Sequence, residues 1–273
     1  MEDLANKDEY LVGKKIVVAL SGGIDSVVLL HFLNKHYPGH IRAVYINHNL
    51  SKFSQEWSAF CAALCNADKI EYKDININLK TSSNVEENAR KKRYLSLTSE
   101  LRVGETLCTA HHQEDQAETF LLQLFRGSGV TGLASMPKIK SIDDSELYRP
   151  FLNISKQKII DYASKNHLEW IEDDSNLDTN FKRNLLRIEF LPKLSSAFNG
   201  LIKNISRSAS HQAEALRLMQ DLAELDIINF ELLINNKIQV SSLIQLPKRR
   251  VANVLRYFIS NLGFLLPSNK VLN

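Results

Sequence analysis

The sequence predicts an α/β fold: a Rossmann-like five-stranded parallel sheet with helices on both faces, followed by a small all-helical domain. Up to about residue 167, short apolar runs rich in Val and Ile alternate with helical segments of about ten to fifteen residues. After Trp170 the chain becomes polar and loop-like, and from Asn180 onward its apolar residues recur at helical spacing. Strand–helix alternation of this kind gives right-handed crossovers and a parallel sheet that is covered on both sides.

The first predicted strand is the apolar run Lys15–Leu20, which leads through the Gly-rich segment SGGIDS into a helix beginning near Ser26. Asn84 is typical of a helix N-cap, because Glu87 three residues later completes a capping box. The other predicted strands cover residues 41–47, 70–77, 105–110 and 147–152, and the other predicted helices cover residues 54–66, 84–101, 113–126, 155–167, 182–190 and 201–229.

The chain has 273 residues, which suits one large domain, or one domain and a smaller one. The change of pattern leads us to expect a first domain over residues 1–195 and a helical domain over residues 196–273. The final LPSNKVLN begins a helix signal and then stops, so we expect a chain that is truncated at its C-terminus.

Composition excludes several classes of protein. Hydrophobic residues make up 44% and charged residues 24%, which excludes wholesale disorder and a fibrous protein. No stretch approaches the ~18–20 apolar residues of a membrane helix, and the acidic N-terminus does not resemble a signal peptide. Cys61, Cys65 and Cys108 are too few for a disulfide framework, and we interpret them as core residues. We therefore expect a cytoplasmic protein with no membrane partner.

Charge is distributed unevenly along the chain. Residues 191–273 contain ten Lys or Arg and five Asp or Glu, a net charge of +5, whereas residues 1–190 contain 24 and 26, a net charge of −2. Solvated helix faces can produce such an excess. A basic C-terminal part is also typical of proteins with a polyanionic partner.

The segment SGGIDS, residues 21–26, is the strongest single motif. Two glycines allow backbone N–H groups to approach a phosphate closely, and the following helix adds its positive end. Asp25 is suited to holding Mg²⁺ against that phosphate. A turn closed by a serine cap is the alternative without a ligand. The loop lacks the Gly-Lys-[Ser/Thr] of a Walker A motif and the spacing of a dinucleotide-binding loop.

The segment HHQEDQAET, residues 111–119, follows the predicted fourth strand. Asp115 and Glu118 are three residues apart and share a helix face, and His111 and His112 lie at the exit of the strand. An acidic first helical turn with solvated histidines would look the same. A zinc site is not favoured, because no third and fourth ligand follow at the usual spacing.

SGGIDS after a first parallel strand resembles the pyrophosphate loop of the N-type ATP pyrophosphatases. Together with HHQEDQAET, which resembles an HHxxDQxET signature, it is similar to the tRNA(Ile)-lysidine synthetase family within that group. Three further segments agree with this family: NVEENARKKRY at 84–94, FRGSGVTGLASMP at 125–137 and DDSNLDTNFKRNLLRIEFLP at 173–192. The five motifs stand in the family's order across most of residues 15–192. One position departs from it, since Ser51 stands where the family often has Arg.

The resemblance implies an enzyme that ligates L-lysine to C2 of the cytidine at the first anticodon position of tRNA(Ile) with a CAU anticodon. ATP adenylates the C2 oxygen and pyrophosphate leaves, after which the lysine amine displaces AMP. The implied partners are this tRNA, L-lysine, ATP and Mg²⁺, and the oligomeric state is left open. The basic residues of the helical domain are expected to contact the tRNA backbone, including the cluster Lys248-Arg249-Arg250.

The resemblance also implies roles for individual residues. The ATP-binding loop comprises Ser21, Gly22, Gly23, Ile24, Asp25 and Ser26. Metal binding falls to Asp25 and Asp115. The expected catalytic residues are Asp25, Asp115, Arg90, Arg93 and His111, and the expected substrate-binding residues are His112, Asp115, Glu118, Arg183 and Arg187. How Asp115 and Glu118 divide Mg²⁺ and lysine between them stays open.

Two other functions compete with this one. The first is another RNA-modifying ATP pyrophosphatase, such as a tRNA thiolase, although the chain offers no plausible reactive cysteine. The second is a non-catalytic nucleotide-binding module, although ionisable residues follow several strands, beyond what nucleotide binding requires.

Overall fold

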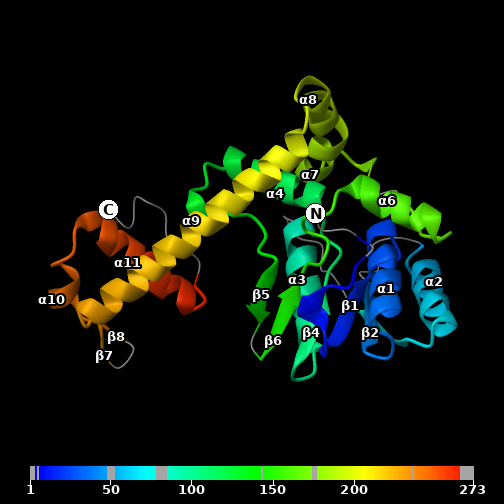
Figure 1. Ribbon diagram of the computed structural model, residues 1–273, viewed down its shortest axis with the longest axis horizontal. Coiled ribbons are helices and arrows are strands. Elements are labelled where there is room, and N and C mark those ends of the chain that lie inside the picture. Colours follow the sequence, from blue (N-terminus) through cyan, green and yellow to red (C-terminus); the bar gives the residue numbers. More distant parts are fainter. Residues whose placement is uncertain are drawn as a thin grey trace.

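The computed structural model describes residue 4 and residues 6–47, 53–77, 85–142, 144–173, 177–234 and 237–264, with the side chains of residues 85–91 left out. A six-stranded sheet in the order β3-β2-β1-β4-β6-β5 forms the centre of the N-terminal part (Figure 1). Neighbouring strands run parallel, except that β5 runs antiparallel to β6. The strands are β1 (Lys15–Leu20), β2 (Ile41–Asn47), β3 (Glu71–Asn76), β4 (Glu105–Cys108), β5 (Ile139–Ile142) and β6 (Ser145–Tyr148).

The α/β class and the parallel sheet are confirmed, but the count of five strands was one too low. β5 is a largely exposed edge strand in which Lys140 and Ser141 separate two isoleucines, so its composition carries little strand signal. The strand predicted over 147–152 ends at Tyr148 instead. Pro150 has no N–H group to donate to a ladder, and the chain turns there.

Helices cover both faces of the sheet. They are η1 (Glu9–Leu11), α1 (Ile24–His36), α2 (Ser54–Ala67), α3 (Val85–Ser99), α4 (Gln113–Phe125), α5 (Val130–Leu133) and α6 (Lys156–Lys165). Successive residues of β1 point to opposite faces: Ile16 and Val18 pack in the core formed with α1, α2 and α6, and Val17 packs in the core beside α3. A strand that is buried on both sides reads as the unbroken apolar run seen in the sequence. The predicted cap Asn84 lies outside the described residues.

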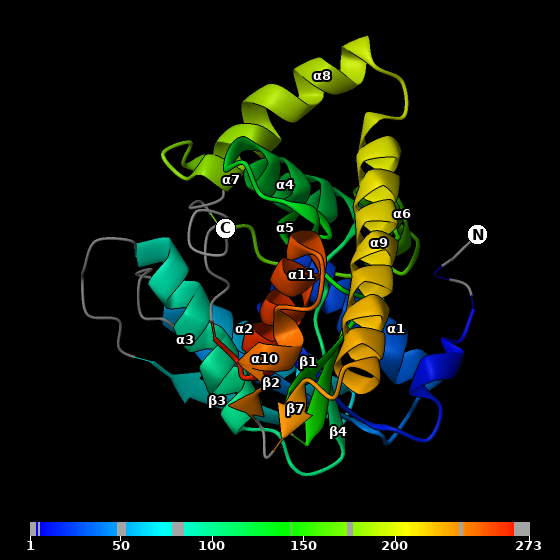
Figure 2. The ribbon, with the colours of Figure 1, turned by 90° about the vertical axis from the view of Figure 1, so that its left-hand side faces the viewer.

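The C-terminal part is built around one long helix. Its elements are α7 (Lys182–Leu185), the π-helical turn η3 (Leu186–Phe190), α8 (Leu191–Ala197), α9 (Leu201–Asn229), β7 (Leu233–Ile234), β8 (Lys237–Ile238), α10 (Val240–Leu243) and α11 (Lys248–Asn261). α9 contacts α4 and α5 near one end and α11 near the other, so it spans from the sheet to the terminal helices (Figures 1 and 2). The hairpin of β7 and β8 corrects the expectation of an all-helical region. The boundary predicted at residue 195 falls inside α8 and stays a prediction.

Two small clusters hold this part together. Leu121 of α4 packs with Leu186 and Leu191, which joins α9 to the sheet side, and Leu232, Leu243 and Val254 form a core at the far end. Asp226 of α9 is fully buried and accepts hydrogen bonds from Arg250 of α11, with 2.9 Å between Nε and Oδ2. Among the described residues, no helix is both long and apolar enough to span a membrane.

One buried ion pair connects β2 and β4, the two strands that flank β1. Arg42 of β2 donates to Glu105 of β4 from Nε, at 2.8 Å, and from its terminal nitrogen, at 2.5 Å, and both side chains are almost fully buried. Burial alone would raise the pKa of Glu105, but the hydrogen bonds from Arg42 and from the Arg102 N–H outweigh it and hold this pKa below its ordinary value. The ionised pair therefore joins two strands that are not adjacent.

We expect Glu105→Gln to lower the free energy of unfolding by about 3 kcal/mol at pH 7, because Arg42 is then buried without its counter-charge. Since the folded-state pKa of Glu105 is depressed, its contribution is fully present above the unfolded carboxyl pKa of about 4.3 and is lost as pH falls. Urea unfolding at pH 7 and pH 3 measures both effects. The control Glu71→Gln breaks an exposed pair with Arg102 and should cost under about 1 kcal/mol. Equal losses for both variants would contradict the assignment.

Candidate functional site

The loop between β1 and α1 lies at the carboxyl end of the first strand, where ligands of parallel sheets bind. Gly22 has φ of +83°, a backbone conformation that requires glycine, and an added Cβ would lie 2.9 Å from Ile171 Cδ1 and displace that side chain. Gly23 has an ordinary φ and caps α1. The Ser26 hydroxyl accepts from the Ser21 N–H at 3.1 Å and donates to the Gly23 carbonyl at 2.9 Å, which closes the loop on itself.

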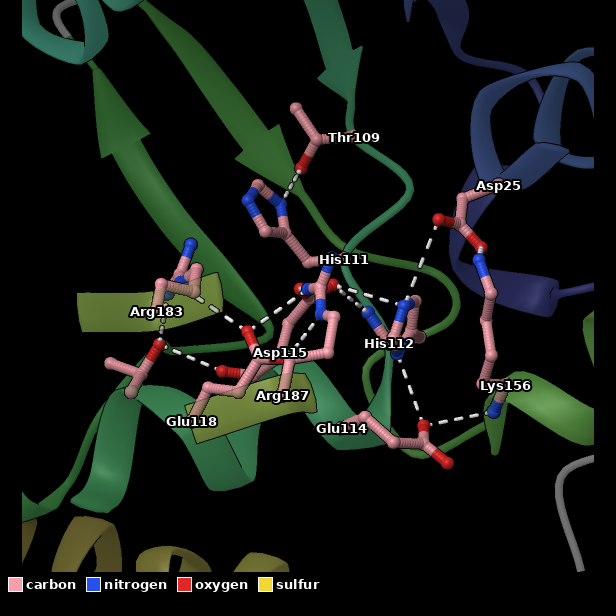
Figure 3. A network of polar contacts seen from close by, with 11 residues as sticks. Asp25, Thr109, His111, His112, Glu114, Asp115, Glu118, Lys156, Arg183 and Arg187 are labelled. Atoms are coloured by element: carbon pink, nitrogen blue, oxygen red, sulfur yellow. Dashed lines mark hydrogen bonds and ion pairs between the residues drawn. The ribbon is translucent and has the colours of Figure 1, made fainter. Parts of the chain in front are cut away.

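Asp25 projects from the first turn of α1 into a group of polar side chains (Figure 3). Lys156, the first residue of α6, places its Nζ 2.6 Å from Asp25 Oδ1. His112 Nε2 lies 3.7 Å from the other carboxylate oxygen of Asp25 and 3.5 Å from Asp115 Oδ2. Three segments that are far apart in the sequence thus meet at the carboxyl end of the sheet.

The start of α4 forms the second half of the site. His112 caps this helix, and its backbone N–H donates to Asp115 Oδ2 at 3.0 Å. The His112 ring Nδ1 lies 3.1 Å from Glu114 Oε2, which also accepts from the Lys156 N–H at 2.8 Å. Glu114 therefore ties the beginning of α4 to the beginning of α6.

Two arginines from the C-terminal segment close over α4 (Figure 3). Arg187 donates from Nε to Glu118 Oε1 at 2.7 Å, and its Nη2 donates to both Glu118 Oε2 at 3.0 Å and Asp115 Oδ1 at 3.1 Å. Arg183 Nε lies 3.3 Å from Glu118 Oε2, and its terminal nitrogen donates to Thr119 Oγ1 at 2.8 Å. Glu118 is fully buried by these contacts.

Burial and neighbouring charges oppose each other at this cluster. Burial lowers the pKa of His112, but Asp115, Glu114 and Asp25 outweigh it and raise this pKa above the ordinary value. Burial would raise the pKa of Asp115, but the nearby His112, His111 and arginines hold it well below its usual range. For Glu118, burial raises the pKa and the negative charge of Asp115 adds to the rise, against the opposing effect of Arg187 and Arg183.

His111 behaves differently from His112. Its ring Nδ1 lies 2.9 Å from Thr109 Oγ1, and burial lowers its pKa to about 3. The His111 ring is therefore neutral at neutral pH and can exchange hydrogen bonds without carrying charge.

A cavity of about 530 Å³ lies beside the Ser21–Ser26 loop, and Arg187 is the member of the charged cluster around Glu118 that lines it. Its wall includes the aromatic side chains of Tyr45, Trp57 and Trp170, which suit a planar base. Its charged lining is Asp25, Arg93, Lys156, Glu172, Asp173 and Arg187. A cavity that combines aromatic walls with charged side chains beside a Gly-rich loop can hold a nucleotide.

The structure brings most of the predicted site residues together. The loop of residues 21–26, His112, Asp115, Glu118, Arg183 and Arg187 form one connected site, with Arg93 in the wall of the cavity. The side chain of Arg90 and the position of Ser51 lie outside the described residues.

Sequence reasoning missed Lys156, Glu114 and Ile171. Lys156 lies at the start of the helix predicted over 155–167, shortly after a predicted strand, but a lone lysine matches no motif. Ile171 lies in a polar stretch, and only its contact with Gly22, with 2.9 Å between Ile171 N and Gly22 O, reveals its role.

Asp25 and Asp115 are the residues that could hold a divalent cation. Within the described part of the chain, no three His, Cys, Asp or Glu side chains gather as a complete metal site. Mg²⁺, however, commonly binds one or two carboxylates together with substrate phosphates. Both carboxylates lie near His112 Nε2, so their nearest oxygens are at most about 7 Å apart. In chemical type, these carboxylate oxygens match the ligands that Mg²⁺ prefers.

Several curated proteins are similar to this chain. It is 42% identical over 260 residues to the tRNA(Ile)-lysidine synthase of Coxiella burnetii, covering 93% of this chain and 58% of that protein. The enzyme of the same name from Nitrosomonas europaea is 38% identical, with 94% and 57% covered, and that from Pseudomonas putida is 37% identical, with 94% and 62% covered. The chain thus spans about three fifths of the length of these relatives.

Among solved structures, the U34-tRNA thiolase NcsA from Methanococcus maripaludis superposes with a TM-score of 0.62 at 17% identity, covering 76% of this chain and 75% of that one. At this identity the likeness concerns the fold alone. The family model described as PP-loop domain matches residues 2–194. That match covers well over half of the chain and includes the Ser21–Ser26 loop, the start of α4 and both arginines of the cluster, so the chain belongs to the PP-loop domain family.

Proposed function

We propose that this chain ligates L-lysine to C2 of the cytidine at the first anticodon position of tRNA(Ile) with a CAU anticodon, using ATP. One observation carries the proposal: the Gly-rich loop and the charged side chains of Asp25, Lys156 and Arg187 line the same cavity, in a chain that resembles tRNA(Ile)-lysidine synthases over 93% of its length. The site thus offers an ATP subsite beside charged groups able to bind an amino acid and a nucleotide.

The chemistry proceeds in two steps. The C2 oxygen of the cytidine attacks the α-phosphorus of ATP, and pyrophosphate leaves. The amine of lysine then attacks C2, a proton leaves the nitrogen, and the C2–O bond breaks with release of AMP. Adenylation is required because a ring carbonyl oxygen is a poor leaving group.

In this proposal the loop binds the ATP phosphates; Asp25 and Asp115 would hold Mg²⁺, which would neutralise charge on those phosphates. At least one of Arg90, Arg93, Arg183 and Arg187 contacts the phosphates or the target nucleotide, because guanidinium groups bind such oxygens in pairs. His111, which stays neutral, serves as a hydrogen-bonding group toward the substrate.

The cysteines favour this reaction over sulfur transfer. Cys61, Cys65 and Cys108 are all buried. Burial raises the pKa of Cys61 and of Cys65 to about 12, and it also raises the pKa of Cys108. Thiolate is the reactive form of cysteine, so none of these thiols is suited to carry sulfur near neutral pH.

Glu118 receives a positioning role in place of the direct lysine contact suggested by the sequence. Its carboxylate is fully buried and is occupied by Arg187 and Arg183. Asp115 is the more accessible of the two carboxylates, since its side chain is 14% exposed. Glu118 then acts by orienting Arg187, which lines the cavity.

The proposal is tested by incubating the chain with labelled lysine, ATP, Mg²⁺ and a CAU-anticodon tRNA(Ile) transcript. We expect lysine to enter the tRNA with AMP and pyrophosphate released in equal amounts. A transcript with U at the first anticodon position should accept no lysine. Sulfur incorporation without lysine would replace the proposal by a thiolase, and pyrophosphate exchange without any tRNA product would contradict ligation.

Replacing Glu118 by Gln keeps the shape of the side chain but removes the charge that orients Arg187. We expect kcat/KM to fall about 10²-fold, with similar factors for ATP and lysine, because a small displacement of a positioning group is costly. Steady-state kinetics with each substrate varied in turn measures this, with the exposed Glu214→Gln as control. An increase in the KM for lysine alone would instead support direct contact.

The basic cluster on α11 is tested with Lys248→Ala/Arg249→Ala. Both residues are exposed, whereas Arg250 is paired with buried Asp226 and is left intact. We expect weaker tRNA binding, and a slope of log K against log salt that is shallower by about one unit per residue, with ATP binding unchanged. Binding assays at several salt concentrations measure the slope. Parental affinity and slope in the double variant would exclude α11 from the tRNA surface.

A further inference from the structure

We infer that Lys156 is the basic side chain of the phosphate loop: it rests on Asp25 in the nucleotide-free protein and transfers to the phosphates when they enter. The inference rests on the proposed use of the loop for pyrophosphate and goes beyond it by assigning a cation and an exchange of partners.

The loop has no basic residue of its own. Ser21–Ser26 offers two hydroxyls, backbone N–H groups and the positive end of α1, but it also contains the carboxylate of Asp25. A pyrophosphate group carries several negative charges, and a nearby carboxylate repels it. Binding through this loop therefore calls for a cation supplied by another segment.

Lys156 is placed to supply that cation. Its Nζ lies 2.6 Å from Asp25 Oδ1, and the residue lines the cavity next to the loop (Figure 3). Its side chain is about one third exposed, as is that of Asp25, so the ammonium group can be reached from the cavity. A lysine ammonium is a compact charge on a flexible stem, and its hydrogen bonds can be redirected by rotation of that stem.

The backbone of Lys156 is held in place while its side chain stays free to turn. The N–H of Lys156 donates to Glu114 Oε2 at 2.8 Å, which fixes the start of α6 to α4. Farther along α6, the Tyr162 hydroxyl lies 3.0 Å from His31 Nδ1 of α1. α6 is therefore anchored to helices on both sides of the loop, and the reach of Lys156 from its Cα is constant.

The exchange of partners is favourable on simple grounds. A carboxylate–ammonium pair that is partly exposed on both sides gains little from its own attraction. A phosphate group offers the ammonium several charged oxygens in the same region. When Lys156 turns to the phosphates, the Asp25 carboxylate loses its ammonium partner. Its oxygens would then be open to a divalent cation that accompanies the nucleotide.

Binding of inorganic pyrophosphate without divalent cations tests the inference by calorimetry. We expect Lys156→Met to weaken binding about tenfold or more and Lys156→Arg to restore part of it. Asp25→Asn removes the competing carboxylate and should tighten binding severalfold. The control Lys165→Met makes the same substitution at the exposed far end of α6, about 13 Å away along the helix, and should bind like the parent.

Parental affinity in Lys156→Met would overturn the inference. Unchanged or weaker binding in Asp25→Asn would overturn the exchange from Asp25. Thermal melting of each variant checks folding, and Lys156→Arg and Asp25→Asn provide the test if Lys156→Met does not fold. The assay uses neither tRNA nor lysine, so a chain that binds pyrophosphate through Lys156 but transfers no lysine would sink the proposed function and leave this inference standing.

Discussion

The contact between Glu118 and Arg187 is the interaction on which the rest of the site depends. It joins α4, which starts at the carboxyl end of β4, to the π-helical turn η3 of the C-terminal part. Because Glu118 is fully buried, its charge must be matched, and Arg187 and Arg183 match it from one side. The same contact holds Arg187 against Asp115, which brings the far segment into the cavity wall.

A second constraint comes from the Ser21–Ser26 loop itself. Gly22 has a positive φ and contacts Ile171, so the segment after α6 lies directly over the loop. This packing places Trp170 and Asp173 in the cavity wall next to residues of β1 and β2. The cavity wall therefore combines residues at the end of the first strand with a stretch about 150 residues later in the chain. Both segments must be in place for the cavity to form.

Charge in the site is organised as a set of shared partners. Glu114 contacts the His112 ring and accepts a hydrogen bond from the Lys156 N–H. His112 also lies close to the carboxylates of Asp25 and Asp115. Asp115 in turn pairs with Arg187. In such a set each ionised group is stabilised by more than one neighbour. A charged molecule or ion that takes one partner therefore changes the surroundings of the others.

The sequence by itself determined the two buried strands β1 and β2 and the residue types of the site. A strand buried on both faces needs an unbroken apolar run, so β1 and β2 could be located to the residue. The loop of residues 21–26 and the start of α4 could be placed at the carboxyl end of the sheet, because parallel topology sends every strand exit to the same edge.

Tertiary structure alone decided which charges meet. The pairing of Lys156 with Asp25 and of Arg250 with Asp226 depends on how helices pack over distances of 131 and 24 residues along the chain, which no local periodicity records. Edge strand β5 and the β7–β8 hairpin were missed for a related reason. Short or polar strands are stabilised by the neighbour they pair with rather than by their own residues.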